Sequence, residues 1–213
     1  MIFEQIRAGG DRNFGYLIGD EKTKEAAVID PSSAPEVFPR AAEKHGLKIV
    51  YIIGTHGHGD HTGGIPFLKK ATGAKVVMYT SSPGNADVRV ADGDVLEIGN
   101  LELKVVHTPG HTSDSICILV GDKLVTGDTL FVGKIGGTHT EEAAEIEYNS
   151  LFSKLMKLDD AIEVYPGHDY GVAPTSSIGH ERETNPFLLR KEFKDFMWLK
   201  DNWAAYKLEH GIK

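Results

Sequence analysis

Four side chains of the kinds that bind metal ions stand close together in the run Thr55-His56-Gly57-His58-Gly59-Asp60-His61. Imidazole and carboxylate groups suit zinc, iron or manganese. The alternating glycines remove side chains that would crowd an ion and allow unusual backbone angles. A single loop histidine is usually only solvated, but four ligand-type residues at this spacing indicate a metal site.

Three further ligand-type residues follow other strand-like segments. His111 comes after residues 101–106, Asp128 after residues 123–126, and His168 after residues 162–165. In layered α/β folds, strand ends from distant parts of the chain converge at one edge, where sites are usually built. We therefore expect all seven ligand-type residues to meet at one place.

Seven ligands are too many for one ion that keeps a position open for substrate, so the sequence predicts two divalent ions. The division that we expect is His56, His58 and His111 on one ion, Asp60, His61 and His168 on the other, and Asp128 as the bridge. Zinc is favoured, with iron and manganese as alternatives. A water held between two cations loses its proton near neutral pH and attacks a carbonyl. The predicted chemistry is hydrolysis, with Asp60 and Asp128 as the candidate catalytic residues.

The elements that must position these residues are short strands alternating with helices. Hydrophobic periodicity predicts strands at residues 14–18, 26–29, 49–53, 74–79, 101–106, 116–120, 123–125 and 162–165. It predicts helices at residues 34–45, 63–71, 141–158 and 188–211, the third after a Thr138–Glu141 capping box. The pattern favours a layered α/β sandwich over an all-β barrel. We expect one domain over residues 1–213, with a short helical extension from about residue 176.

The composition limits compartment and partners. The formal net charge is −8, and no run of Lys and Arg offsets it, which argues against a nucleic-acid partner. Cys117 is the one cysteine, as suits a reducing compartment, and its apolar surroundings predict a buried side chain. The first twenty residues offer no apolar stretch for a signal peptide or membrane span. We expect a cytoplasmic protein without a membrane partner.

The ligand pattern resembles that of the metallo-β-lactamase-fold superfamily. Its His-x-His-x-Asp-His motif is matched by His56, His58, Asp60 and His61, and its later ligands by His111, Asp128 and His168, in the same order. The resemblance covers roughly residues 16–168. It implies an αββα four-layer sandwich with a dinuclear site at one edge.

Within that superfamily the chain most resembles glyoxalase II, the hydroxyacylglutathione hydrolases, and the persulfide dioxygenases. The segments that carry this likeness are 108–113, 126–133 and 185–187. The resemblance implies hydrolysis of a small-molecule thioester such as an acyl-glutathione. The alternative that it leaves open is a persulfide dioxygenase with a single iron, acting on a thiol-derived persulfide. A metal-binding module without catalysis is a third, less favoured reading.

The resemblance also implies roles for three residues outside the ligand set. Tyr170 matches a glyoxalase II tyrosine that helps bind glutathione, and Asp30 matches an aspartate that supports the metal loop by hydrogen bonding. A basic residue that usually follows a glycine after the aspartate ligand is replaced here by Gly136-Gly137, with Lys134 three positions earlier. Lys134 is the remaining substrate-binding candidate. The helical region after His168 is shorter than in glyoxalase II.

Other residues carry weaker indications. His107 and His139 lie close to ligand positions, where either a supporting role at the site or a structural role fits. His45, His180 and His210 are assigned no chemistry. The aromatic stripe of the C-terminal helix, with Trp198 and Trp203, is typical of core or subunit packing, which leaves a homo-oligomer open.

Overall fold

Two mixed β-sheets lie face to face in the structure, a computed structural model that describes residues 1–212. The first sheet has the order β1 (Ile2–Arg7), β2 (Phe14–Gly19), β3 (Glu25–Ile29), β4 (Lys48–Ile53), β5 (Lys75–Tyr79), β6 (Val88–Val90). The second has the order β14 (Ser176–Ser177), β13 (Glu163–Pro166), β10 (Lys123–Gly127), β9 (Ile116–Val120), β8 (Leu101–His107), β7 (Val95–Ile98). A small ribbon pairs β11 (Leu130–Phe131) with β12 (Lys134–Ile135). Lys213, the last residue of the predicted domain, lies outside the described residues.

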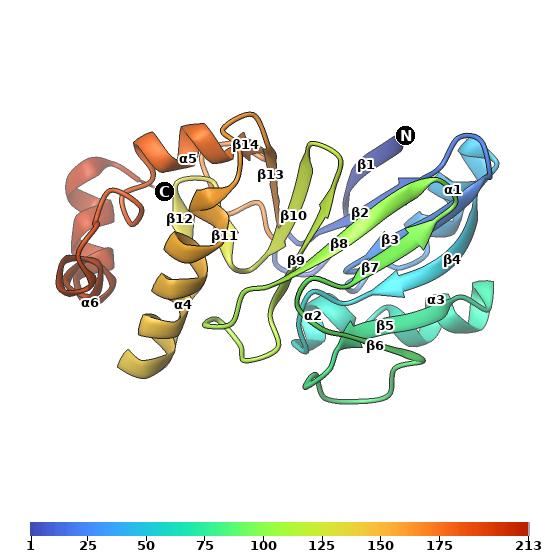
Figure 1. Cartoon of the computed structure of the whole chain (residues 1–213), viewed down its shortest axis with the longest axis horizontal. Coiled ribbons are helices and arrows are strands. Elements are labelled where there is room, and N and C mark those ends of the chain that lie inside the picture. The colour runs from blue at the N-terminus through green and yellow to red at the C-terminus, as the bar shows by residue number, and fades with distance from the viewer. Residues whose placement is uncertain (213) are drawn as a thin grey trace.

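Helices cover the outer faces of both sheets (Figure 1). Helices α1 (Val37–His45) and α3 (Ile65–Thr72) cover the first sheet, while α4 (Glu141–Ser153), α5 (Ile178–Thr184) and α6 (Phe193–His210) cover the second. Shorter elements are α2 (Gly59–Thr62) and the 3-10 turn η1 (Leu155–Lys157). This is the predicted αββα sandwich. In the part of the chain that the structure describes, no helix is long and apolar enough to cross a membrane.

Side-chain alternation along the strands explains the layers. On β9, Ile116 and Ile118 face the core between the sheets, whereas Cys117 faces the helices on the other side. Successive strand residues point to opposite faces, so a strand between two apolar layers is apolar throughout. The buried Cys117 matches the sequence prediction. Burial also raises the pKa of its thiol to about 11, which keeps it neutral.

The predicted convergence of strand ends at one edge is confirmed. The loop after β4 leads into α2, and the loops after β8, β10 and β13 end near it. In the second sheet, β10 and β13 run parallel, so Asp128 and His168 leave their strands on the same side. The turn after β10 packs closely, because a Cβ atom on Gly127, at φ 48°, would lie 2.6 Å from Thr55 Oγ1.

Three helix predictions need correction, the first being the helix over residues 141–158, which ends at Ser153 and is followed by η1. The Thr138–Glu141 capping box is wrong: Thr140 caps α4, its Oγ1 accepting a hydrogen bond from the Ala143 N–H at 3.1 Å. The single helix predicted over residues 188–211 is also too long, since α6 begins at Phe193 and α5 precedes it. Pro186 disfavours helical angles at the residue before it, which explains why α5 ends at Thr184. Both helices and the residues between them pack on the second sheet.

Candidate metal centre

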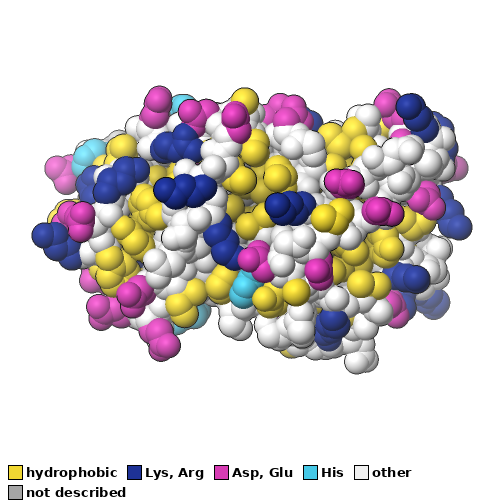
Figure 2. Space-filling model, viewed as in Figure 1, with side chains coloured by type: hydrophobic (Ala, Val, Ile, Leu, Met, Phe, Trp, Pro, Cys, Tyr) yellow, Lys and Arg dark blue, Asp and Glu magenta, His cyan; other side chains and the backbone are white. Residues whose placement is uncertain are grey.

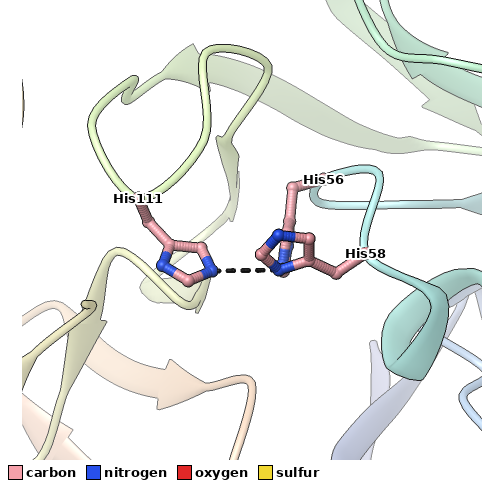
Figure 3. A group of neighbouring side chains, drawn as sticks. All are labelled: His56, His58 and His111. Carbon is pink, nitrogen blue, oxygen red and sulfur yellow. Dashed lines mark hydrogen bonds between the residues drawn. The ribbon is translucent and has the colours of Figure 1, made fainter. Parts of the chain in front are cut away.

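The first donor group joins two loops. His56 and His58 come from the loop after β4, and His111 comes from the loop after β8; Figure 3 shows their rings pointing toward one another. The His58 Nδ1 atom lies 3.0 Å from His56 Nε2 and 3.2 Å from His111 Nε2. Three ring nitrogens from two distant segments therefore face a common point.

The second donor group lies beside the first. His61 Nε2 is 3.1 Å from His168 Nε2, and the Asp60 Oδ2 atom is 3.3 Å from His168 Nε2 and 3.6 Å from His61 Nε2. Asp60 and His61 belong to α2, and His168 follows β13. His61 and His168 are buried, while Asp60 is exposed.

Asp128 lies between the two groups. Its Oδ1 atom is 3.3 Å from His61 Nε2, and its Oδ2 atom is 3.4 Å from His168 Nε2 and 3.7 Å from His111 Nε2. The Oδ1 atom is buried without a hydrogen-bond partner among the described residues. A buried carboxylate oxygen with an unused lone pair among imidazole nitrogens is what a bridging ligand requires.

The outer nitrogens of the histidine rings fix which nitrogen faces inward. His61 Nδ1–H donates to Asp30 Oδ2 at 2.9 Å, His111 Nδ1–H to the Gly137 carbonyl at 2.8 Å, and His168 Nδ1–H to the Asp11 carbonyl at 2.8 Å. Outward donation from Nδ1 leaves the Nε2 lone pair free on the inner side. Metal-binding histidines commonly have this outer support.

Asp30 supports the loop after β4 as well as His61. This fully buried carboxylate accepts hydrogen bonds from the Thr55 backbone N–H at 2.8 Å and from the Thr55 hydroxyl at 2.7 Å. Since the hydroxyl proton of Thr55 is directed to Asp30, its oxygen accepts from His56 Nδ1–H at 3.1 Å. One carboxylate thus orients two predicted ligands, in the position that the resemblance implied.

The donor set fits metal ions better than direct hydrogen bonding between rings. Two neutral imidazole nitrogens that both present lone pairs repel each other unless a cation or proton lies between them. Ligands about 2.0–2.1 Å from a tetrahedral zinc ion stand roughly 3.3–3.4 Å apart. The nitrogen separations of 3.0–3.2 Å are close to this spacing. All seven residues predicted as ligands are brought together, in three overlapping groups that include both predicted triads.

In the metal-free centre, burial keeps one histidine neutral, whereas neighbouring charges favour the ionised forms of Asp128 and His61. Burial lowers the pKa of His56 to about 3, so its ring is neutral. Burial opposes ionisation of Asp128, but the neighbouring His168 and His61 side chains hold its pKa well below the ordinary value. Burial likewise disfavours the charged form of His61, yet Asp30 and Asp128 raise its pKa well above the ordinary value. The two acidic side chains therefore make this part of the centre attractive to cations.

The predicted substrate-binding residues lie at the rim. The Tyr170 ring stacks on His168, with centroids 4.4 Å apart, and its hydroxyl donates to Asp11 Oδ2 at 2.7 Å. The Lys134 ammonium lies 4.5 Å from the centre of that ring. Both residues line a cavity of about 650 Å³ that also contains Val132, Gly171 and Pro186. Their role in substrate binding stays a prediction.

The two additional histidines weighed from the sequence lie outside the donor groups. His107 stacks on Tyr79 and interacts with the Ser113 carbonyl at 2.9 Å, as a structural residue would. His139 lines a second cavity of about 650 Å³ with Lys134, Lys200 and Lys207.

One supporting side chain was not singled out from the sequence. The buried Asn13 amide donates to Asp60 Oδ2 at 3.1 Å and to the Asp60 carbonyl at 3.2 Å. The backbone of Asn13 also forms an isolated β-bridge with His168. The sequence signal that could have indicated Asn13 is its position as a polar residue directly before the apolar strand β2.

Residues 8–168 match the Metallo-beta-lactamase superfamily, and the chain belongs to that superfamily. Hydroxyacylglutathione hydrolase of Polaromonas sp. is 39% identical over 178 residues, which are 80% of this chain and 67% of that protein. The mitochondrial persulfide dioxygenase ETHE1 of Homo sapiens is 34% identical over 195 residues, 88% of this chain and 74% of that protein. A crystal structure of ETHE1 from Myxococcus xanthus superposes with a TM-score of 0.89 and 36% identity, covering 95% of this chain and 91% of the other.

These relatives differ in how much of their length the chain spans. It covers 67% of the Polaromonas hydrolase and 63% of a hydroxyacylglutathione hydrolase from Rhodopseudomonas palustris, or about two thirds. The M. xanthus structure is matched over nearly its whole length. The likeness thus establishes the fold and the superfamily, while the relatives carry two different activities in their names.

Proposed function

We propose that the chain is a metal-dependent hydrolase that cleaves thioesters of small thiols, such as an acyl-glutathione. The observation that carries the proposal is the pair of donor triads with Asp128 between them. Two ions held there would polarise a carbonyl oxygen and acidify a water molecule. Zinc is the first ion to test, because histidine and carboxylate ligands suit it.

The residues of the chain orient this chemistry. Asp30, Thr55 and the Gly137 carbonyl hold the histidine rings in the tautomer that directs a lone pair inward. Asp128, whose histidine neighbours favour its ionised form, faces residues of both donor triads and could bind both ions. In the net reaction, water adds its oxygen to the acyl carbon as the C–S bond breaks, giving a carboxylic acid and a thiol.

The rim suits a small anionic substrate. Lys134 and Arg12 both lie against the Tyr170 ring, at 4.5 Å and 4.6 Å from its centre. On the face shown in Figure 2, basic and acidic side chains are interspersed. Two cations beside one aromatic ring favour a small molecule that bears a carboxylate, while the net charge of −8 disfavours a polyanion.

The test combines metal analysis with a thioester assay. Protein purified without chelators should hold two ions per chain and hydrolyse S-lactoylglutathione, with the thiol product detected by a chromogenic disulfide. Chelation should abolish hydrolysis, and added zinc should restore it. Hydrolysis that persists after complete metal removal would falsify the proposal.

A second candidate is iron-dependent oxidation of a persulfide. The observation that favours it is the nearly full-length match to ETHE1 from M. xanthus. In that reaction a persulfide, dioxygen and water give a thiol, sulfite and protons, so sulfur is oxidised and dioxygen reduced. Iron-loaded protein would then consume oxygen with glutathione persulfide and bind one iron per chain. A flat oxygen-electrode trace under those conditions excludes this candidate.

A further inference from the structure

A buried ion pair connects the C-terminal helix to the surroundings of the candidate metal centre. Glu147 on α4 is fully buried, and its Oε2 atom lies 2.6 Å from the Nζ atom of Lys200 on α6. The other carboxylate oxygen, Oε1, has no hydrogen-bond partner among the described residues. A buried pair of this kind is weak evidence for stability, because removing two charges from water can cost as much as their attraction returns. The buried Glu147–Lys200 pair therefore has a role other than stability to be identified.

Lys200 is linked to His111 through the backbone of Gly136 and Gly137. The Lys200 ammonium also donates to the Gly136 carbonyl at 3.2 Å. The next carbonyl along the chain, that of Gly137, accepts the hydrogen bond from His111 Nδ1–H. Lys200 therefore anchors the peptide segment that fixes the ring orientation of His111.

Glu147 packs against Gly110, the residue directly before His111. The backbone of Gly110, at φ 143°, lies so close to α4 that an added Cβ atom would come within 2.3 Å of the Glu147 Cβ and 2.4 Å of its Cα. One turn further along α4, the Ser150 hydroxyl donates to the Pro109 carbonyl at 2.7 Å. The loop that carries His111 thus rests on the same stretch of α4 that holds the carboxylate.

We propose that Glu147 and Lys200 are positioning residues that hold His111 in its metal-binding orientation, and that α6 thereby controls how tightly one of the two ions is bound. The proposal rests on the metal centre of the proposed function. It assigns the effect to the triad of His56, His58 and His111. The triad of Asp60, His61 and His168 is supported instead by Asp30, Asn13 and the Asp11 carbonyl.

The first experiment measures the metal affinity of Lys200→Met. Methionine fills a similar volume without a donor, so the anchor on Gly136 is lost. Loss of outer support typically weakens metal binding by about 10- to 100-fold. We expect a loss of that size for one ion and no change for the other, measured by competition with a chromogenic zinc chelator. In cobalt-loaded protein the visible absorption of one site should change while the other stays as in the wild type.

A matched control separates this effect from the loss of any lysine–glutamate pair. Lys123 and Glu163 form a partly buried pair at 2.8 Å at the end of β10 remote from Asp128. Lys123→Met should leave both metal affinities unchanged. An equal effect of the two substitutions would show that Lys200 has no specific link to His111.

A double variant distinguishes positioning from a purely structural role. Lys200→Met alone leaves the buried Glu147 carboxylate uncompensated, which lowers stability. Combining it with Glu147→Gln removes that charge, so the melting temperature should recover. The metal affinity should stay low, because the anchor on Gly136 remains absent. Recovery of both properties together would overturn the proposal.

The outcomes separate this proposal from the proposed function. If the wild-type protein binds no divalent ion, the proposed function fails. If it binds one or two ions and Lys200→Met binds them with unchanged affinity and an unchanged cobalt spectrum, the metal centre stands and the positioning role fails.

Discussion

The two sides of the candidate metal centre hold their histidines in different ways. On the side of β3 and β4, one buried side chain, Asp30, orients His61 directly and His56 through Thr55. On the side of β8 and β13, backbone carbonyls do this work: that of Gly137 for His111 and that of Asp11 for His168. Both arrangements give the same tautomer and the same inward lone pair.

The difference determines how each side can fail. A side-chain support is removed by one substitution at the residue itself. A carbonyl is present whatever the residue, so it is displaced only when the segment that carries it moves. We therefore expect the first side to be sensitive at Asp30 and the second side at residues that pack on the segment, such as Lys200.

The largest effect is expected at the residue that both sides share. Asp128→Ala removes the carboxylate that faces His61, His111 and His168, so both ions should be weakened by more than the roughly 100-fold that loss of outer support can cause. Turnover should fall with the metal content, as measured by elemental analysis beside the activity assay. The control is Asp122→Ala, an exposed aspartate directly before β10, which should change neither. Full metal occupancy in Asp128→Ala would refute the central place given to this residue.

The next effect tests the side-chain support. Asp30→Asn replaces an acceptor of three hydrogen bonds with an amide that presents N–H groups to some of the same donors. We expect stability to fall by about 1–3 kcal/mol and the affinity for both ions to fall by about 10- to 100-fold. Asp20→Asn is the matched control, since Asp20 is a buried aspartate that accepts from Lys22 and Asn100 in a distant turn. It should lower stability only; equal metal loss in both variants would contradict the role of Asp30.

The sequence predicted which seven side chains converge, because each belongs to a local pattern. The spacing of His56, His58, Asp60 and His61 is visible in seven residues, and the later ligands directly follow apolar strand runs. The supports were mostly beyond prediction. A carbonyl such as that of Gly137 carries no sequence signal, and the Glu147–Lys200 pair joins helices more than fifty positions apart.

Parts of the fold were missed for related reasons. Strand β1 mixes Glu4, Gln5 and Arg7 with apolar residues and is only half-buried, so its alternation is weak. The C-terminal helix was extended too far because apolar residues continue before Phe193, although Leu188 is buried in an irregular segment. Burial there is decided by contact with the second sheet, which helical periodicity does not record.

A pH measurement tests the burial of Glu147, which lies behind the loop that carries His111. Burial raises the pKa of Glu147 to about 7, although Lys200 opposes the shift, and the ordinary value is 4.5. Between these values the folded protein holds this proton more firmly than the unfolded chain, so the contribution of Glu147 to the free energy of unfolding should decrease as pH rises. The slope reaches at most about 1.4 kcal/mol per pH unit. Urea unfolding of metal-free protein from pH 4.5 to 7.5 should show this decrease relative to Glu147→Gln, and parallel curves would contradict it.

The smallest effect is expected where neither support is touched. Lys134 lies beside Tyr170 and, among the described residues, belongs to none of the candidate metal-binding groups; its pKa is lowered by burial and by the nearby Lys207 and Arg12. If it binds the carboxylate of the substrate, Lys134→Ala should raise KM about 10-fold, the loss of one charge-assisted hydrogen bond, with metal content and kcat nearly unchanged. A thioester without a carboxylate provides the control, because its KM should not respond. A fall in kcat with loss of metal would instead show that Lys134 helps to orient the metal ligands. The comparison of the two sides would then have to include Lys134 and Tyr170 as well.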